Sequence, residues 1–259
     1  MSNYWAKRQA EIQNKLIKKS EKKIERQLAK YYGSTAKSVI REFENVYNKL
    51  LAQSAEGKEI TPADLYKLDR YWQMQGQLRQ QLRRLGEKQI SLLTKEFEIA
   101  FFDIYYSLGI EGAEAFSTID AVAAQQLINS IWVIDGKNFS QRIWDNTERL
   151  IETLNEQLIL TIAAGKKTTD LKNALQERFG VSYSRADTLV RTELCHIQTE
   201  AAKKRYEDYG VQYFEVLVDP DERTCELCKE LIGKRFPING ASPLPVHPNE
   251  RCAIVPIIE

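Results

Sequence analysis

The chain of 259 residues is long enough for one large domain or two smaller ones, each with a hydrophobic core. Hydrophobic residues make up 43% and charged residues 28%, which excludes a largely disordered chain, and the formal net charge of +1 indicates no particular partner. We expect a protein that stays in solution, because no apolar run could span a bilayer and the first residues lack the apolar core of a signal peptide.

The first domain is expected to be a basic helical arm over residues 1–56. Between Met1 and Tyr32 there are nine basic residues and only three acidic ones. An apolar stripe with helical spacing follows, made of Val39, Phe43, Val46, Tyr47 and Leu50. These patterns predict a long helix with a basic first half and an amphipathic second half.

The basic residues of this arm have several interpretations. They could contact the phosphates of double-stranded DNA, without sequence preference and with strong salt dependence. They could also form an ordinary solvated helix face. Aromatic residues at the ends of the basic stretch (Tyr4, Trp5, Tyr31 and Tyr32) could instead anchor it on a protein partner, which we favour over DNA. The candidate contact residues are Lys15, Lys18, Lys19, Lys22, Lys23 and Arg26.

Residues 57–131 are expected to form a second, helical region after a linker near residues 52–58. Thr61 and Pro62 mark a helix start, since Thr is a good N-cap and Pro is favoured in the first turn. The helical pattern continues to about Leu108, and a shorter apolar helix is predicted around residues 121–131.

The third domain is expected to span residues 132–259, with helices up to residue 210. Ser140 is predicted to cap a helix that ends at Gly165, and another helix should run from about Thr169 to a left-handed glycine at position 180. Ser182 is then predicted to cap a long helix that ends at Gly210.

One face of that last helix carries two acidic residues and a histidine: Glu193, His196 and Glu200. A Glu-x-x-His pair occurs in carboxylate metal sites, but those sites need further acidic ligands from neighbouring helices. We therefore favour a capped or salt-bridged helix face. Cys195, in the same helix, is expected to be a buried thiol.

The chain changes character after Gly210. Residues 211–218 and 253–258 are rich in β-branched and aromatic residues, and six of the seven prolines lie at or beyond Pro220. The predicted fold class is mainly α, with long helices followed by a small α+β module at residues 211–259 that resembles a β-hairpin and is stabilised by zinc.

Two close pairs of metal-binding residues lie in this module. Cys225 and Cys228 form a C-x2-C pair, and His247 and Cys252 form an H-x4-C pair. This spacing is typical of a structural zinc site, in which a metal cross-link replaces a large core. A chance cluster is the simpler alternative. A thioredoxin-like redox pair is disfavoured, because the surrounding chain lacks alternating strands and helices.

An enzymatic function is not expected from these residues. The chain has only two histidines, so a metal-bound His247 would leave His196 alone for acid–base chemistry. Four protein ligands would also leave no open position for a catalytic water. No Gly-rich phosphate loop or Ser nucleophile elbow is present.

Several unlike motifs follow one another in a characteristic order. They are Arg191-Thr192-Glu193, then Asp219 and Arg223 just before the C-x2-C pair, then Gly233, Lys234 and Phe236, and finally the segment from Pro245 to Cys252. This order resembles the head-morphogenesis family of tailed phages typified by protein F of phage Mu, and residues 138–144 resemble the helical region that precedes this module. The family often reads His-Pro-Asn-Cys-Arg-Cys, whereas this chain has Glu250 at the first of those cysteines, so Glu250 could act as an oxygen ligand.

The resemblance implies a role in capsid assembly rather than a reaction. It implies a minor head protein that acts at the portal vertex, has the portal protein and other head proteins as partners, and in some phages contacts packaged DNA. The implied location is the host cytoplasm during assembly and then the interior of the virion head. The alternatives are a zinc-containing nucleic-acid-binding protein and, after it, a metal-dependent hydrolase.

Overall fold

Long helices make up most of this computed structural model, which describes residues 3–53, 60–110, 119–133, 135–218, 224–250 and 252–258. The helices are α1 (Asn3–Gln53), α2 (Pro62–Tyr66), α3 (Asp69–Ser107), α4 (Ala121–Ile128), α5 (Phe139–Ala163), α6 (Thr168–Asp208) and α7 (Glu226–Lys229). The strands are β1 (Tyr213–Leu217), β2 (Arg235–Pro237) and β3 (Ala253–Ile257). The predicted fold class, mainly helical with a small β-containing module at the C-terminal end, is confirmed.

The chain divides into two compact units, each assembled from separate segments. The sheet unit comprises Met1–Glu25, Leu92–Phe139 and Asp187–Glu259, and the helical unit comprises Arg26–Ser91 and Ser140–Ala186. The ranges expected from the sequence, with boundaries at residues 56 and 131, do not coincide with these units. The reason is that α1, α3 and α6 each contribute residues to both units.

The helical unit is held together by the apolar stripe expected in the second half of α1. Its five residues Val39, Phe43, Val46, Tyr47 and Leu50 are all fully buried, at no more than 2% exposure. The hydroxyl of Tyr32 lies among polar groups of the same unit, 3.3 Å from Ser182 Oγ and 3.2 Å from the side-chain nitrogen of Asn146. Tyr32 is therefore an internal packing residue and is not available to a partner.

Helix α6 corrects the expectation that one helix ends at Gly180 and another starts at Ser182. The helix continues through both positions, and Gly180 is not among the residues with positive φ. A glycine inside a helix costs about 1 kcal/mol relative to alanine. Here a buried stripe on both sides of the glycine outweighs that cost; it consists of Leu171, Leu175, Phe179, Ser182 and Ala186.

Two other helix boundaries show where local signals were sufficient and where they were not. Pro62 begins α2 as expected, and the Thr61 N–H donates to the Asp64 carboxylate at 3.1 Å. However, α2 ends at Tyr66 and a separate helix starts at Asp69, a break that the sequence did not predict. Helix α5 starts at Phe139, so Ser140 lies inside it rather than capping it.

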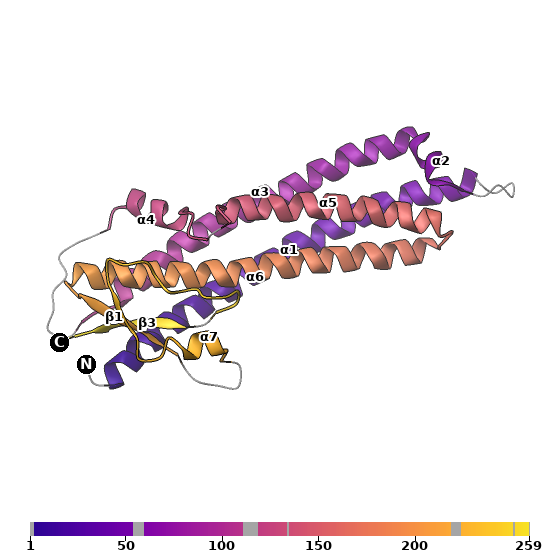
Figure 1. Ribbon diagram of the computed structural model, residues 1–259. Helices are drawn as coiled ribbons and strands as arrows, with labels where there is room; N and C mark the ends of the chain where they lie inside the picture. Colours follow the sequence, from indigo (N-terminus) through magenta and orange to yellow (C-terminus); the bar gives the residue numbers. More distant parts are fainter. Residues whose placement is uncertain are drawn as a thin grey trace. The chain divides into compact units, whose positions relative to one another are not determined.

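The sheet unit contains an antiparallel sheet with the strand order β2-β1-β3. The strands β1 and β3 correspond to the two expected strands, whereas β2 was not predicted. In the central strand, Phe214 is paired with Phe236 on one side and Pro256 on the other. Figure 1 shows β1 and β3 beside the N-terminal end of α1.

The start of α1 belongs to the core of the sheet unit and is not a free arm. Ala6 and Ala10 form a buried cluster with Ala253 and Val255 of β3, where small side chains permit close packing. The Gln13 side chain donates a hydrogen bond of 2.8 Å to the carbonyl of Ile254. None of the helices in the described part of the chain is long and apolar enough to cross a membrane.

Two glycines of α3 in the helical unit provide a matched test of packing. A Cβ at Gly76 would meet nothing within 4 Å, whereas a Cβ at Gly86 would lie 2.8 Å from the Trp144 ring. We expect Gly76→Ala to stabilise the protein by about 0.5–1 kcal/mol through helix propensity. Gly86→Ala should destabilise it by about 1–3 kcal/mol, because the rigid indole ring must move. Urea denaturation measures both, and equal effects would contradict the close packing of Trp144.

Candidate metal centre

A short helical turn brings the C-x2-C pair together. Cys225 is the N-cap of α7, and its sulfur accepts a hydrogen bond of 3.4 Å from the backbone N–H of Cys228. The Cys225 carbonyl accepts a further bond from Lys229 N–H at 3.1 Å, which closes the turn. The turn therefore places both sulfur atoms near one point, as a shared metal ligand requires.

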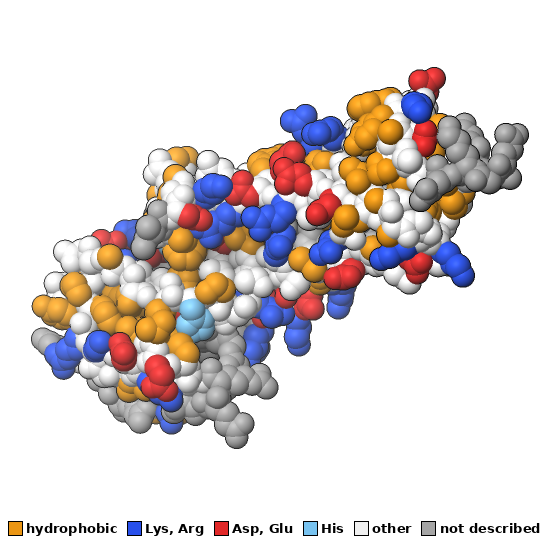
Figure 2. Space-filling model, turned by 45° about the vertical axis from the view of Figure 1, so that its right-hand side comes forward, with side chains coloured by type: hydrophobic (Ala, Val, Ile, Leu, Met, Phe, Trp, Pro, Cys, Tyr) orange, Lys and Arg blue, Asp and Glu red, His pale blue; other side chains and the backbone are white. Residues whose placement is uncertain are grey.

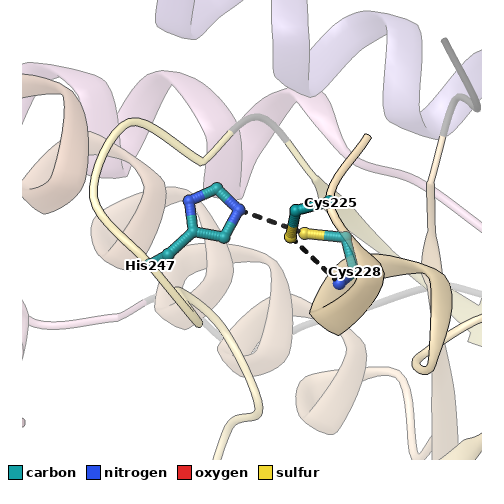
Figure 3. Close-up of side chains that lie close together, drawn as sticks. All are labelled: Cys225, Cys228 and His247. Carbon is teal, nitrogen blue, oxygen red and sulfur yellow. Dashed lines mark hydrogen bonds between the residues drawn. The ribbon is translucent and has the colours of Figure 1, made fainter. Parts of the chain in front are cut away.

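The imidazole of His247 faces these sulfur atoms (Figure 3). Its Nε2 atom lies 3.3 Å from Cys228 Sγ. Its Nδ1 atom lies 2.8 Å from the carbonyl of Pro248, which suits donation of an N–H to that oxygen. Metal-bound histidines commonly use this arrangement, because it fixes the ring and leaves the other nitrogen free to bind.

The loop that carries His247 has a defined backbone shape. Asn249 adopts a left-handed conformation with φ of 62°, which asparagine tolerates better than most residues. The Asn249 N–H lies 3.4 Å from the hydroxyl of Thr192 on α6. The loop is therefore anchored to the helix that carries the Arg191-Thr192-Glu193 motif.

Two further donors follow in the same segment. Glu250 is only 5% exposed, and one of its carboxylate oxygens lies 3.6 Å from Cys228 Sγ. The other oxygen accepts a hydrogen bond from the backbone N–H of Val246. Cys252 is buried at the start of β3, with its sulfur in a second cluster near Cys228 and Glu250.

The donors fall into two groups that share Cys228. Cys225, Cys228 and His247 form one group, and Cys228, Glu250 and Cys252 form the other; within each group the donor atoms lie within 4.8 Å of one another. In tetrahedral zinc sites, the usual bond lengths separate neighbouring ligand atoms by about 3.5–3.8 Å. The separations of 3.3 Å and 3.6 Å from Cys228 Sγ are close to these values. The two groups share only Cys228, so among the described residues no four donors lie within 4.8 Å of one another.

The local environment affects the four sequence-predicted ligands differently. Burial raises the pKa of Cys228 to about 12 and also raises the pKa of Cys252. The hydrogen bond from the Cys228 backbone lowers the pKa of Cys225, and the Pro248 carbonyl raises the pKa of His247. In the absence of a cation, the buried sulfurs are thus thiols, and a metal ion that binds them must displace their protons.

The donors face a cavity of about 540 Å³ in the sheet unit. Residues of α1 and α6 form its other walls, among them Lys18, Glu21, Arg191 and Cys195. The cavity gives an ion or a chelator a path to the donors.

The Arg191-Thr192-Glu193 motif mainly connects elements of the sheet unit other than the tail. Arg191 pairs with Glu21 of α1 at 2.7 Å, and Glu193 accepts a hydrogen bond from the Trp132 indole at 3.1 Å. Thr192 of the same motif contacts the tail at the Asn249 N–H. Asp219 and Arg223 lie outside the described residues.

The face with Glu193, His196 and Glu200 forms no metal-donor group among the described residues. His196 is stacked on Trp132 with a centroid distance of 4.6 Å and an interplanar angle of 15°. Burial lowers the pKa of His196 to about 3, so its ring is neutral near pH 7. His196 is thus a packing residue. Cys195 is buried as expected, at 3% exposure.

The six basic candidates of α1 are all exposed, but they are not equivalent. Lys19 lies 3.6 Å from Asp103, and Lys23 lies 2.8 Å from the buried carboxylate of Glu96. Lys18 lines the cavity beside the metal donors. Arg26 belongs to the helical unit, whereas the five lysines belong to the sheet unit. Some of these charges therefore stabilise the fold.

Substitutions of two buried cysteines test which of them binds the metal ion and which is only buried. Cys228 belongs to both donor groups, so Cys228→Ser should abolish stoichiometric metal binding. Cys195 also lines the cavity but belongs to neither group, so Cys195→Ser should leave the metal content unchanged. Elemental analysis of gel-filtered protein measures both. A similar metal loss in the two variants would contradict this assignment.

Comparison with known proteins indicates a family that this chain resembles. Residues 152–255 match the family model described as Phage Mu protein F like protein. No match was found among curated proteins or among solved structures. The matched segment starts inside α5 and ends inside β3, so it contains the Arg191-Thr192-Glu193 motif and the candidate metal ligands. Over these residues the chain is similar to the phage Mu protein F-like family, which confirms the resemblance indicated by its motifs.

Proposed function

We propose that this chain is a minor head protein that acts in head morphogenesis of a tailed phage or prophage, as a structural component rather than an enzyme. The observation that carries the proposal is the family match over residues 152–255. Residues 187–255 of the match belong to the sheet unit and contain the motifs that Thr192 and Asn249 bring into contact, whereas residues 152–186 belong to the helical unit.

The site of action in this proposal is the portal vertex of the procapsid. Family resemblance supports this position, and it makes the portal protein and other head proteins the partners. The protein would be synthesised in the host cytoplasm and would end inside the virion head.

A structural zinc ion is the second part of the proposal. The sheet has strands of only five, three and five residues, which bury little apolar surface. In zinc-finger peptides, metal binding contributes about 10–16 kcal/mol of folding free energy. A zinc ion held by Cys225, Cys228, His247 and a fourth donor from the segment 250–252 would join α7 to the loop before β3.

We also propose that exposed lysines of α1 contact packaged DNA. Lys15, Lys18 and Lys22 have no ion-pair partner among the described residues, unlike Lys19 and Lys23. They lie three to four residues apart and so share one face of the helix. Figure 2 shows basic and acidic side chains interspersed on the face in view.

Head assembly is tested by isolating procapsids from cells with and without this gene. We expect the protein to be present in wild-type procapsids and to be cross-linked to the portal protein, and heads made without it should be fewer or defective. Absence of the protein from wild-type procapsids would refute the proposed function.

DNA contact is tested with a charge variant that leaves the internal ion pairs intact. Lys15→Gln, Lys18→Gln and Lys22→Gln together should weaken binding to double-stranded DNA about equally for all sequences. The slope of log K against log salt concentration should fall by up to about 3, because each phosphate contact contributes nearly one unit. Fluorescence anisotropy at several salt concentrations measures the slope. An unchanged slope would exclude these lysines from DNA contact.

A further inference from the structure

The buried carboxylate of Glu250 lies beside the metal donors without a described cation to balance it. The side chain is 5% exposed, and its Oε1 atom is 3.6 Å from Cys228 Sγ. Among the residues that the structure describes, no Lys or Arg lies within ion-pair distance of it. A buried carboxylate is costly unless it is paired with a charge or coordinates a metal ion. A metal ion next to Cys228 Sγ would balance the charge of an ionised Glu250.

The carboxylate is also held in place by its own loop. Its Oε2 atom accepts a hydrogen bond from the Val246 N–H, which closes the loop around His247. The left-handed Asn249 and its contact with Thr192 shape the same loop. One oxygen of Glu250 thus fixes the loop that presents His247, while the other points to Cys228.

Cys252 has a different environment, although it belongs to the same donor group. The three residues after it, Ala253, Ile254 and Val255, are at most 1% exposed. Cysteine is among the residues most often buried as an uncharged, weakly polar side chain. A neutral thiol is therefore stable at position 252, whereas an ionised carboxylate at position 250 gains more from a metal ion beside it.

We propose that Glu250 is the fourth ligand of the metal ion and binds it through Oε1. The other three ligands are Cys225, Cys228 and His247, and Cys252 remains a buried thiol beside the site. This inference rests on the metal site of the proposed function.

The mixed donor set has a consequence for the kind of metal that binds. Two sulfurs, one imidazole nitrogen and one carboxylate oxygen still suit zinc, which accepts all three donor types. Replacing a thiolate by a carboxylate makes the site less selective for thiophilic ions. Glu250→Cys should therefore increase the preference for Cd²⁺ over Zn²⁺.

X-ray absorption at the zinc edge of the full-length, zinc-loaded protein distinguishes the two ligand sets. We expect two sulfur scatterers at about 2.3 Å and two nitrogen or oxygen scatterers at about 2.0–2.1 Å. Cys252→Ala should keep this spectrum and full zinc occupancy. Three sulfur scatterers in the wild-type protein would overturn the assignment of Glu250.

The affinity for Zn²⁺ is measured by competition with a chromophoric chelator. The size of its loss in a variant distinguishes a metal ligand from a residue that only supports the ligands. Loss of an outer-shell contact typically costs 10–100-fold in metal affinity. Glu250→Gln keeps an oxygen for Val246 but loses the anionic ligand, so its affinity for Zn²⁺ should fall by more than 100-fold. Cys252→Ala is the matched control and should change it less than tenfold, with circular dichroism confirming that both variants fold.

These experiments distinguish failure of this inference from failure of the proposed function. Reversed effects of the two substitutions, or a loss in Glu250→Gln of 100-fold or less, would overturn Glu250 as a ligand and leave the zinc site intact. A wild-type protein that binds no stoichiometric zinc would overturn the metal site itself and this inference with it. Neither result would bear on the presence of the protein in procapsids.

Discussion

The contacts of Cys228 connect the parts of the C-terminal module on which its geometry depends. Its backbone N–H donates to the Cys225 sulfur, and its own sulfur lies 3.3 Å from the His247 ring and 3.6 Å from the Glu250 carboxylate. Short strands alone provide little burial to hold such groups together. A cation bound at this point would balance the buried charge and join α7 to the loop before β3, so local folding and metal binding would be coupled.

This module is also joined to the helices of its own unit, which gives the site a defined support. Thr192 of α6 contacts the loop at Asn249, Gln13 of α1 bonds the Ile254 carbonyl, and small residues of α1 pack against β3. These contacts fix the loop and β3 to α1 and α6 within the sheet unit. On the neighbouring face of α6, His196 stacks on the Trp132 ring and Glu193 accepts a hydrogen bond from its indole N–H, so both residues contribute to packing.

Several features could be predicted because they depend on short-range patterns. The stripe from Val39 to Leu50 follows helical periodicity, Pro62 marks a helix start, and residues 213–217 and 253–257 have β-rich composition. The candidate ligands were recognisable because a C-x2-C turn and a nearby histidine pair have characteristic spacing. A lone glycine and serine, in contrast, gave a false helix boundary at residues 180–182, where burial of one continuous stripe overrides local preference.

The sequence by itself determined the helical composition, the presence of a small β module, the family resemblance and the set of candidate donors, because each depends on residues close together along the chain. Only the tertiary structure decided that α1 begins inside the sheet unit, that Arg191 pairs with Glu21, and that Lys23 pairs with Glu96. It also placed Glu250 in a buried position against Cys228. These outcomes depend on contacts between residues far apart in sequence, and on which charges are removed from water, so no local pattern encodes them.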